Sequence, residues 1–217
     1  IIEDLNVGVN GKTFLGVIFK NVGFEKSIQK LIFQDFLEVR LNNVSVSKNI
    51  KNVEIEMSNK DTSQDIESKL IVENSNFRTG SLTTRDTPFY FTVTNEQVQK
   101  NRCMRQLGVF RITNNFFDNF AEDTIMMTRG SEFEFNRNKI ELIQEKSIQI
   151  KNVKKVLFIN NFLGVPQLNA IKIMALKQPN ACPAEKEPID EIDTITFNNN
   201  KMSRSSIDFI LVNAEVN

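Results

Sequence analysis

The stretch Val109-Phe-Arg-Ile-Thr-Asn-Asn-Phe-Phe117 predicts the fold of this chain. Apolar residues stand at Phe110 and Ile112, two Asn residues follow, and an apolar residue returns at Phe117. Because side chains alternate across a strand, Phe110 and Ile112 face the same side. Asn tolerates the left-handed backbone region better than most residues, so Asn114 suits a sharp turn between two short strands.

The same spacing of apolar, any, apolar, any, Asn, any, any, apolar recurs seven times along the chain. All 21 apolar slots are filled, and Asn occupies its slot in every copy except one, which has Arg137. The steps between copies are 22, 31, 40, 23, 23 and 39 residues, which indicates a basic period of 22–23 with inserts in three copies. The copies are Val17-Phe19-Asn21-Phe24, Val39-Leu41-Asn43-Val46, Leu70-Val72-Asn74-Phe77, Phe110-Ile112-Asn114-Phe117, Phe133-Phe135-Arg137-Ile140, Val156-Phe158-Asn160-Leu163 and Ile195-Phe197-Asn199-Met202.

A repeat of this size, built from two short strands around an Asn turn, is typical of a parallel β-solenoid. A second apolar column makes nearly the same steps, at Ile125-Met127, Ile148-Ile150, Ile171-Ile173 and Ile210-Val212. A neighbouring Asn column stands at Asn115, Asn138, Asn161 and Asn200. Coils about 4.8 Å apart would bring equivalent amides into hydrogen-bonding range, so we expect an asparagine ladder. A β-sandwich is the alternative fold.

With these repeats the chain resembles the right-handed parallel β-helix proteins of the pectin-lyase-like superfamily, from about Leu5 to Val212. The resemblance implies an all-β solenoid of about seven to eight coils with loop inserts. It is architectural and says little about activity. Hydrolases of that superfamily use Asp groups from adjacent coils, and lyases use Arg or Lys with Ca²⁺-binding carboxylates. Their Asn-Thr-Asp, Asp-Asp, Gly-His-Gly and Arg-Ile-Lys motifs are not found here, so no catalytic residue is carried over.

Composition narrows the classes of function. The 27 Lys and Arg residues balance the 27 Asp and Glu residues, so there is no global argument for nucleic acid or an anionic membrane as partner. No apolar run reaches the ~20 residues that cross a bilayer, so we expect no membrane insertion. The repeat runs through the middle without a linker, so residues 1–217 are expected to form one β-helix domain, a fragment of a longer protein.

Catalysis finds little support in the residue types. The chain has no His, which removes the commonest general acid–base residue and any His-ligated metal site. We find no phosphate-binding glycine loop among the eight glycines. We therefore expect no catalytic, cofactor-binding or metal-binding residues, and lean against an enzyme.

Three inserts are expected to carry recognition, because loops on one side of a solenoid usually do so. They lie between Val46 and Leu70, from about Thr94 to Gln106, and from Lys177 to Asp193. The third holds an acidic cluster that we interpret as solvated rather than as a Ca²⁺ site. Basic residues of the second insert and of a later segment are candidates for a glycan-binding stripe if their coils stack. They are Lys100, Arg102, Arg105, Lys151, Lys154 and Lys155.

Two covalent features depend on where the protein resides. Cys103 and Cys182 are candidates for a disulfide, although their coils would be about three steps apart, so only the loops could bring them together. Two unrelated loop thiols are the alternative. Asn43-Val-Ser45 is an N-glycosylation sequon, which has meaning only in a secreted chain and requires an exposed turn at Asn43.

The sequence thus predicts a non-catalytic β-helix module for binding or adhesion, at the cell surface or outside the cell, with an unidentified protein or glycan partner. One alternative is a carbohydrate-active enzyme, either a polysaccharide lyase or a glycoside hydrolase. Another is a structural matrix or coat protein that associates end to end, because solenoid edges expose unpaired strands.

Overall fold

The computed structural model is an all-β solenoid, and no helix occurs in the part of the chain that it describes. That part comprises residues 4–7, 16–24, 30–33, 38–46, 53–58, 69–78, 89–94, 108–120, 124–128, 130–143, 147–166, 170–176, 192–203 and 210–214. The strands are β1 (Asp4–Val7), β2 (Val17–Phe24), β3 (Lys30–Phe33), β4 (Glu38–Val46), β5 (Val53–Ser58), β6 (Lys69–Glu73), β7 (Asn76–Phe77), β8 (Phe89–Thr94), β9 (Val109–Thr113), β10 (Phe116–Phe120), β11 (Ile125–Thr128), β12 (Glu132–Asn136), β13 (Lys139–Ile143), β14 (Ile148–Lys151), β15 (Lys155–Ile159), β16 (Phe162–Pro166), β17 (Ile171–Leu176), β18 (Thr194–Asn198), β19 (Lys201–Met202) and β20 (Ile210–Ala214).

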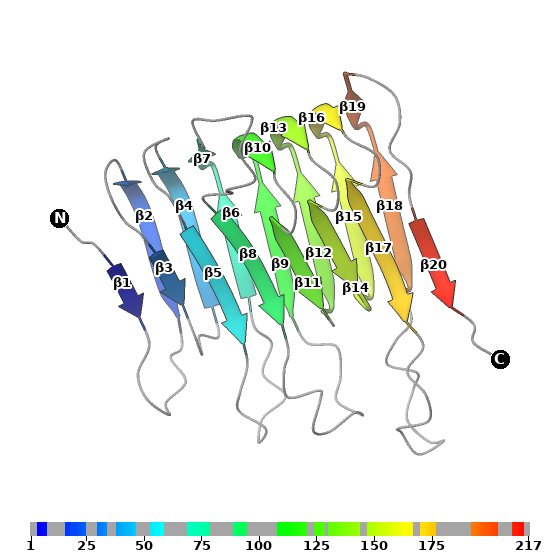
Figure 1. Ribbon diagram of the computed structural model, residues 1–217, viewed down its shortest axis with the longest axis horizontal. Coiled ribbons are helices and arrows are strands. Elements are labelled where there is room, and N and C mark those ends of the chain that lie inside the picture. The colour runs from blue at the N-terminus through cyan, green and yellow to red at the C-terminus, as the bar shows by residue number, and fades with distance from the viewer. Residues whose placement is uncertain are drawn as a thin grey trace, which may run out of the picture.

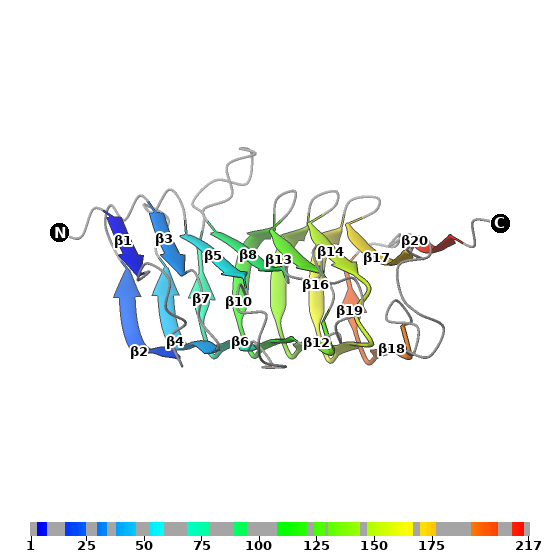
Figure 2. The same cartoon turned by 90° about the horizontal axis from the view of Figure 1, so that it is seen from below.

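Each full coil has three faces, and every strand pairing between coils is parallel (Figures 1 and 2). The first face holds β6, β9, β12, β15 and β18, and the second holds β7, β10, β13, β16 and β19. β2 and β4 bend through the turn and contribute to both. The third face holds β5, β8, β11, β14, β17 and β20, and β1 and β3 continue its line.

The coils wind to the right, as the sequence predicts. In Figure 1 the strands of the third face lie nearer the viewer and run downward, whereas those of the first face lie behind and run upward. The chain meanwhile advances from left to right, which is right-handed winding. The first coil holds β2 and β3, the second β4 and β5, the third β6–β8, the fourth β9–β11, the fifth β12–β14, the sixth β15–β17 and the seventh β18–β20. Seven coils, with β1 ahead of them, agree with the expected seven to eight.

The core is made of files of like side chains, one residue from each coil. Ile112, Phe135 and Phe158 pair across β9, β12 and β15 and are all fully buried. Ring centroids of Phe135 and Phe158 lie 5.7 Å apart, and those of Phe158 and Phe197 lie 4.8 Å apart in a stacked arrangement. This confirms the predicted column and explains how a chain rich in Phe fills a narrow interior.

The second apolar column is confirmed except in the last coil. Ile125, Ile148 and Ile171 pair with one another as predicted. In β20, however, Leu211 pairs with Ile173, and Ile210 pairs with Lys172. The step on the third face is therefore 38 residues, not 39, and the predicted alignment of Ile210 with Ile171 is wrong by one residue. The segments before the first-face and third-face strands of this coil differ in length, so one face does not fix the register of the other.

The turn between the first and second faces follows one backbone rule. The seven residues of the Asn slot, which we call the turn column, all have positive φ, between 52° and 59°. They are Asn21, Asn43, Asn74, Asn114, Arg137, Asn160 and Asn199. This is the left-handed region, in which Asn is favoured among residues with a side chain.

Buried amides beside the turn column form the expected ladder, which we call the inner ladder. Its members are Ser75, Asn115, Asn138, Asn161 and Asn200. In each step a backbone N–H and a side-chain amide donate to the Oδ1 atom of the next coil, at 2.9 Å and 3.0 Å from Asn115 to Asn138. The remaining amide hydrogen of Asn138 is donated to the carbonyl oxygen of Ile112 at 2.8 Å. The amides are thereby satisfied inside the core, where an unpaired polar group would be costly.

Candidate functional site

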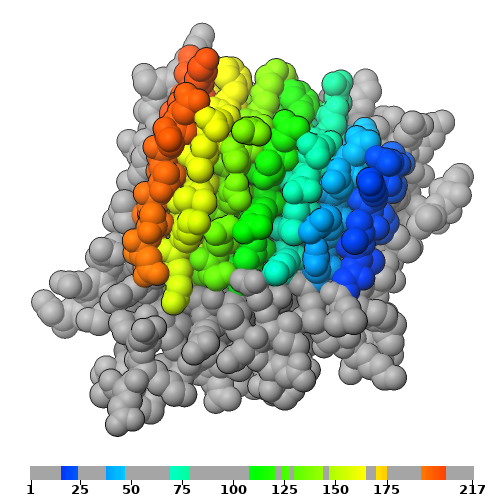
Figure 3. All heavy atoms as spheres, turned by 180° about the vertical axis from the view of Figure 1, so that it is seen from behind, coloured from blue at the N-terminus to red at the C-terminus, as the bar shows by residue number. Residues whose placement is uncertain are grey.

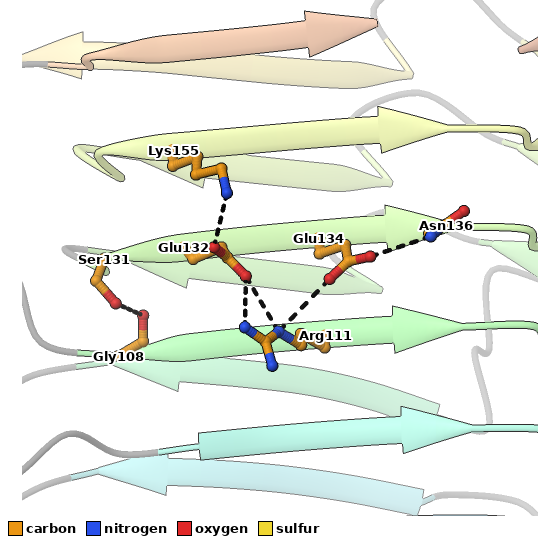
Figure 4. Close-up of polar contacts among 7 residues, drawn as sticks. All are labelled: Gly108, Arg111, Ser131, Glu132, Glu134, Asn136 and Lys155. Carbon is orange, nitrogen blue, oxygen red and sulfur yellow. Dashed lines mark hydrogen bonds and ion pairs between the residues drawn. The ribbon is translucent and has the colours of Figure 1, made fainter. Parts of the chain in front are cut away.

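Charged side chains cluster on the outer surface of the first face, over the fourth to sixth coils (Figures 3 and 4). Glu132 begins β12 and Lys155 pairs with it from β15, while Arg111 of β9 pairs with Glu134. These residues alternate with the buried Phe133 and Phe135, so the strand period directs them outward. Figure 3 shows this side of the molecule as neighbouring ridges, one for each coil.

Glu132 is the centre of this cluster. Its Oε1 atom accepts hydrogen bonds from the Nε and Nη2 atoms of Arg111 at 3.0 Å and 2.8 Å. Its Oε2 atom accepts one from the Nζ atom of Lys155 at 3.1 Å. Glu134 lies 3.5 Å from the Arg111 Nε atom and accepts a hydrogen bond from the side-chain amide of Asn136 at 3.1 Å (Figure 4).

The surroundings of Glu132 fix its charge. Partial burial raises the pKa of its carboxyl, but the hydrogen bonds and positive charges of Arg111 and Lys155 lower it by more. The net pKa is below the ordinary value for Glu, so the group is ionised at neutral pH. A general acid needs a raised pKa. The cluster is therefore an ion-pair network that ties three coils together, not an acid poised to protonate a leaving group.

The third face offers no carboxylate in its best described strands. β11, β14 and β17 contain neither Asp nor Glu. Met126, Gln149 and Lys172 pair with one another at the partly exposed position of these strands. Within the described residues, no group of three or more His, Cys, Asp or Glu side chains is placed to hold a metal ion.

The second face carries a file that alternates aromatic and basic residues. Phe116, Lys139, Phe162 and Lys201 pair successively across β10, β13, β16 and β19. The Nζ atom of Lys139 lies 5.2 Å from the centroid of the Phe116 ring, and the guanidinium carbon of Arg78 lies 5.6 Å from it. Phe162 is 39% exposed, which is unusual for a ring in a solenoid whose core is otherwise filled by Phe.

Arg137 adjoins this file at the corner between the first and second faces. It is exposed and has a φ of 56°, and its backbone N–H donates to the carbonyl oxygen of Ile159 at 2.9 Å. Side-chain amides of the turn column bond along the axis on both sides of it, from Asn114 to Asn74 and from Asn199 to Asn160, each at 2.7 Å. Arg137 interrupts this outer ladder between Asn114 and Asn160.

The predicted basic stripe is only partly within the described residues. Lys151 ends β14 on the third face, whereas Lys155 begins β15 on the first face. Lys151, Lys154 and Lys155 thus lie around the corner of one coil, and Lys155 is paired with Glu132. Lys100, Arg102 and Arg105 lie outside the described residues, so the stripe stays a prediction.

The other predicted features stand as follows. Asn43 is exposed and its amide donates to the Oδ1 atom of Asn21 at 2.8 Å, which meets the exposure that a glycan there requires. Cys103 and Cys182 lie outside the described residues, as does the acidic third insert up to residue 191. Among the residues described, none forms a helix with the length and hydrophobicity that crossing a membrane takes.

Sequence reasoning singled out Arg137 only as a departure from the Asn column and did not single out Lys139 or Phe162. A signal for them was present, because Phe116, Lys139, Phe162 and Lys201 occupy one slot of the repeat. That slot directly follows the Asn pair and faces outward, so an apolar ring there is exposed by the strand period.

Comparison with known proteins adds no relative: no model of a known protein family, no curated protein and no solved structure matches the chain.

Proposed function

We propose that this chain is a non-catalytic β-helix module that binds an extended glycan and works at the cell surface or outside the cell. The scaffold supplies a straight array of coils about 4.8 Å apart, on which outward residues repeat at regular intervals. Such an array suits a partner that is itself a repeating chain. The architectural resemblance to the pectin-lyase-like superfamily, whose hydrolases and lyases act on polysaccharides, supports a glycan as the partner class.

The observation that carries the non-catalytic part is the state of the first-face carboxylates. Glu132 accepts hydrogen bonds from both Arg111 and Lys155 and has a lowered pKa. Glu134 is held by Arg111 and Asn136. Glycosidic bond hydrolysis needs one carboxylic acid with a raised pKa beside a second free carboxylate. The cluster supplies neither, and the chain has no His to take the role of the acid.

The proposal is tested by measuring binding and turnover on the same samples. Purified protein is run through native gels that contain polygalacturonate, alginate, heparin or neutral dextran. In parallel, the polymers are incubated with the protein and assayed for ultraviolet-absorbing unsaturated products and for new reducing ends. Retardation by at least one charged polymer without products supports the proposal. Products above the level of a heat-denatured control, or no retardation by any polymer, would overturn it.

A further inference from the structure

We propose that the corner of the fourth to sixth coils is an acidic-sugar subsite, in which Arg137 and Lys139 bind a carboxylate or sulfate and Phe162 stacks on a sugar ring. This inference rests on the proposed glycan-binding function and names the class of sugar and its place. In Figure 1 the corner lies at the top of the molecule, where β10, β13 and β16 stand side by side.

The first argument is the backbone of Arg137. A left-handed conformation costs an ordinary L-residue about 1 kcal/mol, and Asn less, because its short polar side chain is tolerated there. Six coils use Asn in this slot, and the fifth uses Arg at a φ of 56°. The substitution also interrupts the outer ladder between Asn114 and Asn160. A residue that destabilises the turn on both counts is explained by binding rather than by folding.

The second argument is the position of a second cation. Lys139 follows Arg137 by two residues, pairs with Phe116 in the coil before and with Phe162 in the coil after, and is exposed. Its Nζ atom lies 5.2 Å from the Phe116 ring, so a cation–π contact restrains the ammonium group. It is also 3.3 Å from the Oε1 atom of Glu141, but both side chains are about half exposed, so a ligand anion can compete with that contact.

The third argument is the pair of rings on either side of the cations. Phe116 and Phe162 are two coils apart, which is about 10 Å along the axis. The fifth coil between them presents Arg137 and Lys139, and its two neighbours present an amide and a ring each: Asn114 with Phe116, and Asn160 with Phe162. An anionic sugar at the middle coil would therefore have cations beneath it and an exposed apolar ring under the next sugar.

The chemistry favours an acidic glycan over a nucleic acid. The guanidinium of Arg137 presents a planar set of donors that matches a carboxylate or a sulfate. Nucleic acid binding draws its affinity from many phosphate contacts. This corner offers two cations, and the whole chain has equal numbers of basic and acidic residues. Single-stranded DNA, which also stacks on aromatic rings, is used below as the competing probe.

The experiment measures the dissociation constant of galacturonate and heparin oligosaccharides by calorimetry, and unfolding by urea for every variant. Replacing an anion-binding cation removes a charge-assisted contact, so Arg137→Asn and Lys139→Gln should each weaken binding about tenfold. Arg137→Asn should at the same time make the protein more stable, which separates lost binding from lost folding. Arg137→Lys should retain part of the affinity, Phe162→Ala should weaken binding, and Glu141→Gln should strengthen it.

Lys20→Gln, an equal charge change at an exposed position of β2 on the first face, is the matched control and should leave affinity unchanged. If the oligosaccharides bind and Arg137→Asn, Lys139→Gln and Phe162→Ala all bind as wild type does, the subsite is wrong and the glycan-binding function stands. If no oligosaccharide binds to wild type, both fall. If oligothymidine displaces the glycan at equal concentration, the assignment to an acidic sugar is overturned.

Discussion

A single backbone angle determines much at the residue scale. Every member of the turn column adopts the same left-handed conformation, whether its side chain is Asn or Arg. The coil therefore imposes the conformation, and the residue type decides only how much free energy that imposition costs. In six coils Asn keeps the cost low, and Arg137 is the exception.

We expect Arg137→Asn to stabilise the protein by about 1 kcal/mol, because Asn tolerates positive φ and can restore the outer ladder between Asn114 and Asn160. The measurement is the urea midpoint at constant slope. Arg137→Ala is the control, since Ala removes the same side chain but gains neither advantage. A midpoint for Arg137→Asn at or below that of Arg137→Ala would contradict the account of the turn.

The ionisation of Glu132 gives a prediction for pH. Its pKa is lower when folded than when unfolded, so it contributes stability that is fully present above the unfolded pKa. That contribution is lost as pH falls through the folded pKa. Glu132→Gln should therefore reduce stability at pH 7 by up to about 1 kcal/mol and flatten the decline in stability below the unfolded pKa of Glu. Urea unfolding at a series of pH values measures both effects, and equal slopes for the two proteins would refute this assignment.

At the scale of strands and ladders, the chain's periodicity carries most of the fold. The files through Ile112, Phe135 and Phe158 and through Asn115, Asn138 and Asn161 could be predicted, because each repeats at one slot of the coil. The register of β20 was missed by one residue because the third face follows a segment of different length. The partners of Arg111 and Lys155 were not predictable from spacing alone, since long outward side chains choose among several neighbours.

The inner ladder should be a major source of stability. Asn138→Ala would remove two hydrogen bonds to the Oδ1 atom of Asn138 and leave the buried backbone N–H and amide of Asn115 without that acceptor. We expect a loss of roughly 3 kcal/mol in the free energy of unfolding. The control is Asn136→Ala in the same coil, where the amide has one bond to Glu134 and its Oδ1 atom has no partner, so the change should be within about 0.5 kcal/mol. Similar losses for the two variants would show that the ladder is not special.

Two glycines test how closely β13 and β16 approach each other. A Cβ atom at Gly164 would overlap the carbonyl oxygen of Glu141 and lie 2.8 Å from its Cα atom, so the two strands would have to separate. Gly164→Ala should therefore cost about 2 kcal/mol or more, as overpacking against backbone does. Gly23→Ala in β2, where no atom lies within 4 Å of the added Cβ, should be neutral or slightly stabilising. Thermal unfolding of both variants gives the answer, and equal melting temperatures would mean that the strands yield easily.

For the molecule as a whole, the repeat was predictable and the recognition surface was not. The number and winding of the coils follow from spacing, because stacking like side chains is the one arrangement that buries every apolar slot. The candidate subsite depends on outward residues such as Arg137 and Phe162, and packing places no demand on those positions. Their role appears only when the coils are stacked and their neighbours are known.

The equality of the coils allows a test by duplication. A second copy of residues 131–153, inserted after Val153, would meet the same neighbours that the original meets, since the steps on both sides are 23 residues. We expect a folded protein that is longer by about 4.8 Å along its axis and unfolds at a higher urea concentration. Small-angle scattering measures the length. A duplicate of 22 residues is the control, because a slip of one residue would turn the core side chains outward and should prevent folding. If both fold equally well, register does not depend on the files.

The inner ladder has a direction, and this makes the two poles of the solenoid unlike. Every amide from Asn115 onward presents its oxygen toward the N-terminal side and donates toward the C-terminal side. Asn200 ends the described series as a donor, whereas the equivalent slots of β4 and β2 are Val44 and Val22, which offer no side-chain acceptor. Two copies meeting head to tail would thus bury Asn200 against a hydrocarbon, so the polarity of these amides acts as a safeguard against fibre growth.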